Sequence, residues 1–130
     1  MQSKSSLRTP LGRVRGLGSA KSGTGHFWLQ RVTAVSNLIL AIIFVGVTVS
    51  LVGKPYPAAV AILSQPCVAI LALLFILSAC VHMRLGMQVV IEDYIHGEGL
   101  KVLAVMANTF FALAVGAASV FAVLKLSFGG

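Results

Sequence analysis

Three long stretches of the chain contain no Lys, Arg, Asp or Glu. They cover residues 32–53, 55–83 and 102–124, with 22, 29 and 23 residues. A helix needs about 20 apolar residues to cross about 30 Å of hydrocarbon. The stretches lack the period-2 alternation of strands, and only closed barrels place strands in lipid. The pattern therefore predicts an all-α membrane protein with three transmembrane helices that run up, down and up.

Two short polar segments separate the stretches and set the expected domain boundaries. Residues 53–57 hold two prolines, and residues 96–99 hold two glycines. We expect residues 1–25 to form a flexible basic cytoplasmic tail and residues 26–130 to form a three-helix membrane anchor domain. The expected helices lie at about residues 28–53, 60–92 and 100–126.

The second helix is expected to overrun the bilayer. Pro66 should lie in its first regular turn, because a proline there loses no hydrogen bond. Residues 66–91 would then form about 39 Å of helix, so the carboxyl end projects into the membrane interface. The third stretch carries small residues at four-residue spacing, such as Ala112 and Gly116. Such spacing lets helices approach closely but names no partner.

The composition agrees with a membrane protein and excludes a soluble domain. Of the 130 residues, 58% are hydrophobic and 10% are charged, and the mean hydropathy is +0.97. A soluble domain carries about 25% charged residues. The polar shell that a soluble core needs is therefore missing.

The net charge of +7 is concentrated at the amino end. No acidic residue precedes the first stretch, and six basic ones do: Lys4, Arg8, Arg13, Arg15, Lys21 and Arg31. A basic tail is one signature of nucleic-acid binding. We favour the positive-inside rule, because the tail leads directly into a spanning segment. The amino terminus is then cytoplasmic, the carboxyl terminus lies across the membrane, and no nucleic-acid partner is expected.

His82 lies about two turns inside the cytoplasmic end of the second helix. An ionisable side chain at that depth is costly and is a candidate functional residue. Ser78, Ala79 and Gly86 are small and share its helix face. A flat haem fits such a face, and its iron takes histidine as an axial ligand. The alternative is a neutral histidine bonded to a neighbouring helix. A second haem ligand would have to come from another chain.

Other polar residues near the cytoplasmic membrane interface have either a functional or a purely structural interpretation. Arg31 can pair with a haem propionate, a lipid phosphate or a partner carboxylate, or it can snorkel at the boundary. Arg84 lies on nearly the opposite face from His82 and is equally ambiguous. Asp93 and Tyr94 lie where the second helix leaves the membrane. A phenol there can donate to a quinone carbonyl, but an interfacial tyrosine beside a solvated acid is the simpler interpretation.

The second helix resembles a known family at specific positions. His82 is followed by Gly86 four residues on, and by Asp93 and Tyr94 eleven and twelve residues on. The first helix begins with Arg-x-Thr-Ala, residues 31–34, after a basic, glycine-rich lead. Over about residues 23–125 the chain is similar to the hydrophobic membrane anchor subunits of bacterial succinate dehydrogenase, the cytochrome b-type subunits D.

This resemblance implies a role for each matching residue. His82 would be an axial ligand of haem b, whose iron is shared with a histidine of a companion cytochrome b subunit. Tyr94 would bond the carbonyl of ubiquinone, and Asp93 would lie beside that site. Arg31 would lie near the haem propionates or the quinone. His26, whose spacing to Arg31 departs from that of the family, would be a further propionate contact.

The implied function is to anchor a succinate:ubiquinone oxidoreductase in the bacterial inner membrane, with the carboxyl terminus periplasmic. The implied partners are the companion cytochrome b subunit, an iron–sulfur subunit, a flavoprotein subunit and membrane lipid. The chain has no dinucleotide fingerprint and no cysteine cluster, so it is not expected to catalyse the reaction alone. The alternatives are a small transporter or channel subunit, in which His82 relays protons, and a structural assembly protein, in which His82 only links helices.

Overall fold

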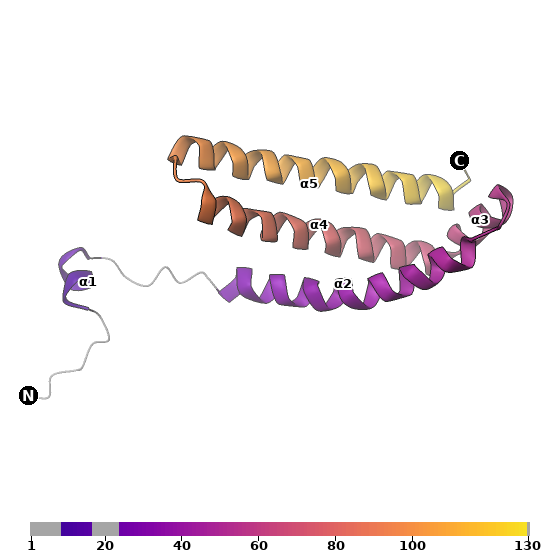
Figure 1. Cartoon of the computed structure of the whole chain (residues 1–130), viewed down its shortest axis with the longest axis horizontal. Helices are drawn as coiled ribbons and strands as arrows, with labels where there is room; N and C mark the ends of the chain where they lie inside the picture. Colours follow the sequence, from indigo (N-terminus) through magenta and orange to yellow (C-terminus); the bar gives the residue numbers. More distant parts are fainter. Residues whose placement is uncertain (1–8, 17–23, 130) are drawn as a thin grey trace, which may run out of the picture.

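The computed structural model describes residues 9–16 and 24–129, which form five helices (Figure 1). These helices are α1 Pro10–Val14, α2 Thr24–Leu51, α3 Tyr56–Leu63, α4 Pro66–Tyr94 and α5 Glu98–Ser127. Helices α2, α4 and α5 are long and apolar enough to cross a membrane. This confirms the predicted three-helix membrane fold. The expected flexible tail falls mainly on residues 1–8 and 17–23, which lie outside the described residues.

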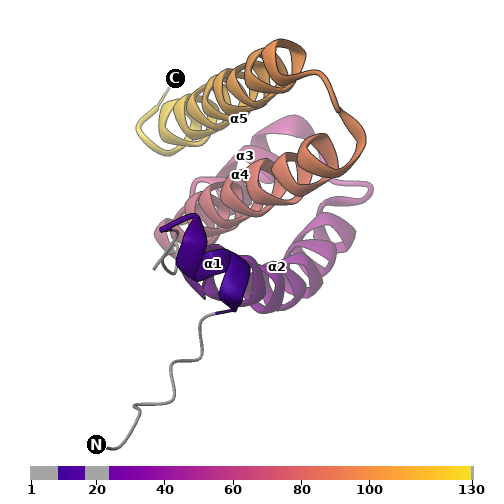
Figure 2. The ribbon, with the colours of Figure 1, turned by 90° about the vertical axis from the view of Figure 1, so that its left-hand side faces the viewer.

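Helix α4 is the centre of the fold. It packs against α2 on one side and against α5 on the other, and the end-on view places it between them (Figure 2). Few of the described side chains are buried, and they come from all three long helices: Thr33, Leu40, Ala69, Leu85, Ile91 and Ala112. Most large apolar side chains, such as Phe110 and Phe121, point outward. The chain therefore presents an apolar surface that suits lipid or other membrane subunits.

The second apolar stretch is broken where the sequence predicted one helix over about residues 60–92. Helix α3 ends at Leu63, and α4 begins two residues after Ser64 with Pro66. Proline disfavours the helical conformation of the residue before it, and Gln65 is extended, with φ −60° and ψ 132°. Pro66 itself occupies the first turn of α4, as predicted.

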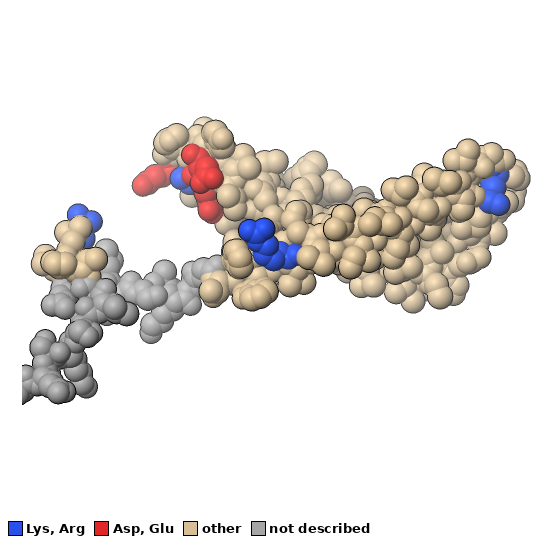
Figure 3. Space-filling model, turned by 60° about the horizontal axis from the view of Figure 1, so that its bottom comes forward, with Lys and Arg blue, Asp and Glu red and all other residues tan. Residues whose placement is uncertain are grey.

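All three long helices exceed the thickness of the bilayer core. They contain 28, 29 and 30 residues, which is about 42–45 Å of helix against about 30 Å of hydrocarbon. The start of α2, the end of α4 and the start of α5 lie at the same end of the molecule (Figure 1). Acidic side chains gather at this end, and a long uncharged surface separates it from the basic group at the other end (Figure 3). We call it the polar end.

Helices α4 and α5 approach closely at Gly116. A Cβ atom added to Gly116 would lie 3.2 Å from the sulfur of Cys80, and Ala112 is only 5% exposed. The close approach predicted from the small residues of the third helix is therefore confirmed, with α4 as the partner. Nearer the polar end, the Asn108 amide donates to the Arg84 carbonyl at 2.9 Å.

Candidate functional site

His82 of α4 contacts Thr33 of α2. The distance between His82 Nδ1 and Thr33 Oγ1 is 3.1 Å. His82 is half-buried, and Thr33 is 7% exposed. The structure thus contains the contact to a neighbouring helix that was one interpretation of His82. A role as a ligand is compatible with it, because imidazole has two ring nitrogens and Nε2 has no hydrogen-bond partner among the described residues.

The small residues around His82 bring α2 close to α4. Ser78 Oγ donates to the Thr33 carbonyl at 3.4 Å. A Cβ atom on Gly86 would lie 3.4 Å from Gln30 Nε2. The flat face expected beside His82 is therefore partly covered by α2, and small side chains are needed there for helix packing. The imidazole of His82 still remains partly accessible.

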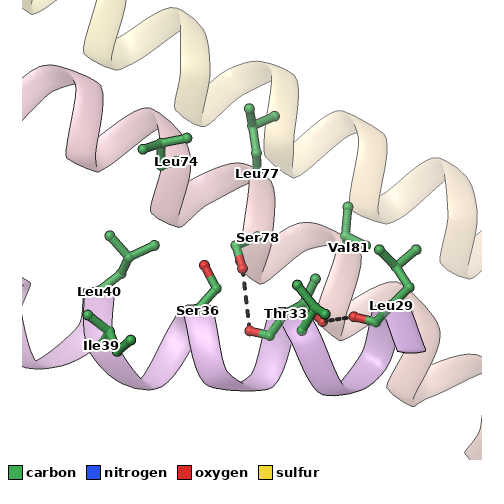
Figure 4. Close-up of a pocket in the computed structure, with 10 residues that line it drawn as sticks. Leu29, Thr33, Ser36, Ile39, Leu40, Leu74, Leu77, Ser78 and Val81 are labelled. Carbon is green, nitrogen blue, oxygen red and sulfur yellow. Dashed lines mark hydrogen bonds between the residues drawn. The ribbon is translucent and has the colours of Figure 1, made fainter. Parts of the chain in front are cut away.

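An apolar groove follows the contact between α2 and α4 (Figure 4). Its volume is about 520 Å³. The α2 side includes Leu29, Thr33, Ser36 and Leu40, and the α4 side includes Leu74, Leu77, Ser78 and Val81. Figure 4 shows the hydroxyls of Thr33 and Ser78 engaged in hydrogen bonds at its floor. The groove thus presents mainly hydrocarbon and suits an apolar chain or another helix.

Arg31 and His26 line one cavity at the polar end. It has a volume of about 300 Å³, and Gln30 and Leu85 also line it. The Arg31 guanidinium lies 5.1 Å from the ring centroid of Phe27, a cation–π arrangement. Both Arg31 and His26 are exposed. The structure therefore brings together the two residues that the resemblance assigns to haem propionates.

A second polar cavity, of about 690 Å³, lies between the amino end of α2 and the last turns of α4. His26 lines this one as well, together with Arg84, Gln88 and Glu92. The Gln88 amide donates to a carboxylate oxygen of Glu92 at 2.8 Å. Arg84 therefore belongs to a polar cavity, but to a different one from Arg31.

Asp93 and Tyr94 form the end of α4. Tyr94 is its last residue and is 77% exposed, and Asp93 is exposed too. No hydrogen bond to either side chain is found within residues 24–129. Twelve residues separate Tyr94 from His82, which is about 18 Å along the helix. This chain therefore leaves its expected quinone residues at the surface of the polar end, open to another subunit.

The residue that sequence reasoning missed is Thr33. It entered only as a letter of the Arg-x-Thr-Ala motif, although a hydroxyl within a spanning stretch is a signal for bonding between helices. Gln30 and Asn37 carry the same signal. Their side-chain oxygens are buried in α2 and have no hydrogen-bond partner among the described residues.

The fold and the site define a small integral membrane protein with three spans, in which a histidine of one span contacts a neighbouring span. Residues 5–123 match the model of the succinate dehydrogenase/fumarate reductase transmembrane subunit family. The chain belongs to this family, which confirms the resemblance. It is thus a membrane anchor subunit of such a complex, and other subunits of the complex are its partners.

Individual relatives agree with the family match. The chain is 33% identical over 121 residues to the succinate dehydrogenase hydrophobic membrane anchor subunit of Paracoccus denitrificans, with 93% of each chain covered. It is 31% identical over 107 residues to the subunit of the same name from Rickettsia bellii, covering 82% of this chain and 86% of the relative. The succinate dehydrogenase membrane anchor subunit of Reclinomonas americana is 31% identical over 99 residues, covering 73% of this chain and 82% of the relative.

Proposed function

We propose that this anchor subunit binds haem b through His82 and contributes Tyr94 and Asp93 to a ubiquinone-reduction site. A companion cytochrome b subunit supplies the second axial ligand. The observation that carries the haem proposal is the position of His82, an imidazole within a spanning helix. Its Nδ1 is engaged by Thr33 at 3.1 Å, and its Nε2 has no partner in the described part of the chain. Haem iron takes such a nitrogen as a ligand.

The residues present fit one half of a haem site. Of the three histidines of the sequence, His26 and His96 lie outside the uncharged stretches and His82 lies within one, so His82 is proposed as the single ligand from this chain. Arg31 and His26 share a cavity, and their cationic forms suit the carboxylates of the haem propionates. Bound haem supplies one-electron redox chemistry, and the chain's own residues hold and orient it.

The quinone part of the proposal rests on the end of α4. The Tyr94 hydroxyl donates to a ubiquinone carbonyl, and Asp93 holds a proton beside it. Both side chains are exposed on this chain, which supports a site completed by another subunit. We propose that this is the iron–sulfur subunit, which passes electrons from a flavoprotein subunit that oxidises succinate. The membrane is then the bacterial inner membrane, with the polar end facing the cytoplasm.

The test compares two histidine variants in the purified complex. His82→Ala should remove the haem, measured as the molar ratio of haem to flavoprotein subunit in the purified complex. His96→Ala is the matched control, because His96 is exposed in the linker after α4 and should keep the haem. A normal haem content and spectrum in His82→Ala would exclude His82 as the ligand.

A further inference from the structure

Thr33 makes three polar contacts through one hydroxyl group. Its Oγ1 lies 2.7 Å from the Leu29 carbonyl, 3.2 Å from the Gln30 carbonyl and 3.1 Å from His82 Nδ1. A hydroxyl has only one hydrogen to donate, but its oxygen also accepts. These contacts therefore cannot all be donated by Thr33.

The distances favour the Leu29 carbonyl as the acceptor of the hydroxyl hydrogen. The contact to the Leu29 carbonyl is the shortest, and it has the usual length of an O–H···O bond. It is also the usual bond of a helical threonine to the carbonyl four residues earlier. When the Thr33 hydroxyl donates its hydrogen bond to the Leu29 carbonyl, Oγ1 presents only a lone pair to His82. The 3.1 Å contact then has the length of an N–H···O bond donated by Nδ1.

We propose that Thr33 is a positioning residue that holds His82 in the tautomer with hydrogen on Nδ1 and a free lone pair on Nε2. A neutral imidazole carries one N–H, so a donor at Nδ1 leaves Nε2 as the nitrogen that binds iron. This inference rests on the proposed haem site, and it specifies which nitrogen is the ligand and what fixes it.

The backbone of Thr33 also contacts α4. Its carbonyl accepts the hydrogen bond from Ser78 Oγ at 3.4 Å, and Ser78 lies one turn before His82 on α4. The hydroxyl that orients the imidazole is therefore tied to the same helix that carries the imidazole.

The acceptor on Nδ1–H also changes the ligand strength of His82. A hydrogen-bond acceptor at the second ring nitrogen makes the imidazole a stronger donor to the metal. A stronger donor stabilises ferric over ferrous haem and lowers the midpoint potential. Removing the acceptor therefore raises the potential and changes the electron paramagnetic resonance spectrum of the ferric haem, which reports the orientation of its axial imidazoles.

The experiment uses Thr33→Val, which keeps the branched shape and removes the hydroxyl, in the complete complex. We expect the preference of the His82 imidazole for ferric over ferrous haem to fall by up to about tenfold. This fall corresponds to a rise of up to about 59 mV in the midpoint potential of the haem. Thr33→Ser should restore the wild-type potential and spectrum. Thr48→Val is the matched control, because Thr48 makes the same helical bond, to the Phe44 carbonyl at 2.8 Å, and its variant should leave both unchanged.

The outcomes separate this inference from the haem site on which it rests. Haem that survives in His82→Ala would refute the site. Haem that is lost in His82→Ala, with an unchanged potential and spectrum in Thr33→Val, would overturn the role of Thr33 alone. If Thr33→Val does not assemble, Thr33→Cys is measured instead, since sulfur is a weak acceptor, and it must show the same rise in potential.

Discussion

At the residue scale, Tyr94 differs from His82, the other end of the spacing motif on α4. His82 contacts Thr33 within the chain, whereas Tyr94 is 77% exposed at the end of α4. A large aromatic side chain in that position has its polar group free for a ligand or another subunit. In the proposed function, the chain therefore orients its haem ligand itself, whereas it supplies the quinone site only with an exposed donor.

Removing the hydroxyl of Tyr94 is expected to slow quinone reduction without disturbing assembly. In Tyr94→Phe the ring is kept and one hydrogen bond to the quinone carbonyl is lost, which costs about 0.5–1.5 kcal/mol, or about 2- to 13-fold in rate. The measurement is succinate-driven reduction of a ubiquinone analogue by the purified complex. Succinate oxidation with an artificial acceptor should stay normal.

The second tyrosine of the chain provides the control for this prediction. Tyr56 begins α3 at the opposite end of the spanning helices and is 81% exposed. Tyr56→Phe should leave quinone reduction unchanged. If Tyr94→Phe reduced both activities equally, the role of Tyr94 would lie in assembly and not in quinone binding.

The sequence indicates which residues are candidates, but it does not indicate their contacts. The spacing of His82, Asp93 and Tyr94 is a local feature of one helix, so it can be seen in the sequence. The contact of His82 with Thr33 joins residues 49 positions apart, and it depends on how α2 packs against α4. The hydroxyl of Thr33 within a spanning stretch was a signal for a bond between helices, but spacing along the chain does not identify His82 as its partner.

At the element scale, the packing of α5 on α4 depends on the absence of a side chain at Gly116. The nearest atom to an added Cβ is the Cys80 sulfur at 3.2 Å, followed by Cys80 Cβ at 3.8 Å. Gly116→Val should therefore force the two helices apart and destabilise the complex by about 1–3 kcal/mol. The measurement is the midpoint of thermal denaturation in mild detergent.

Two further variants assign this effect to the contact with Cys80. Gly46 lies in α2, and a Cβ there would meet nothing within 4 Å, so Gly46→Val should be much less destabilising. Removing the sulfur with Cys80→Ala should reduce the penalty of Gly116→Val, because the two substitutions act on one contact. Equal penalties with and without the sulfur would contradict the proposed clash.

The helices themselves were predictable to different degrees. Long apolar stretches predicted all three spans, because length and hydropathy decide whether a helix can cross a bilayer. The expected helix over about residues 60–92 omits the break before Pro66, although Pro66 itself was expected in the first regular turn. The conformational restriction on Gln65, which precedes the proline, was the local signal for the break.

At the scale of the whole molecule, the charges define two unlike ends. Arg31, Glu92 and Lys101 belong to the polar end, where the Lys101 ammonium donates to the Glu92 carbonyl at 3.1 Å. Lys54, after α2, and Lys125, in the last turn of α5, belong to the other end. The sequence before α2 carries five more basic residues, namely Lys4, Arg8, Arg13, Arg15 and Lys21. Lys and Arg near spanning helices favour the cytoplasmic side.

This asymmetry predicts a cytoplasmic polar end. A phosphatase that is active only in the periplasm should be active when fused after residue 130 and inactive when inserted in the linker between α4 and α5. Replacing Arg13, Arg15 and Lys21 by Gln should weaken this preference, because the bias comes from basic residues close to the first span. The reversed pattern of activity would place Tyr94 on the periplasmic side. It would then separate the proposed quinone residues from any cytoplasmic subunit that delivers electrons to them.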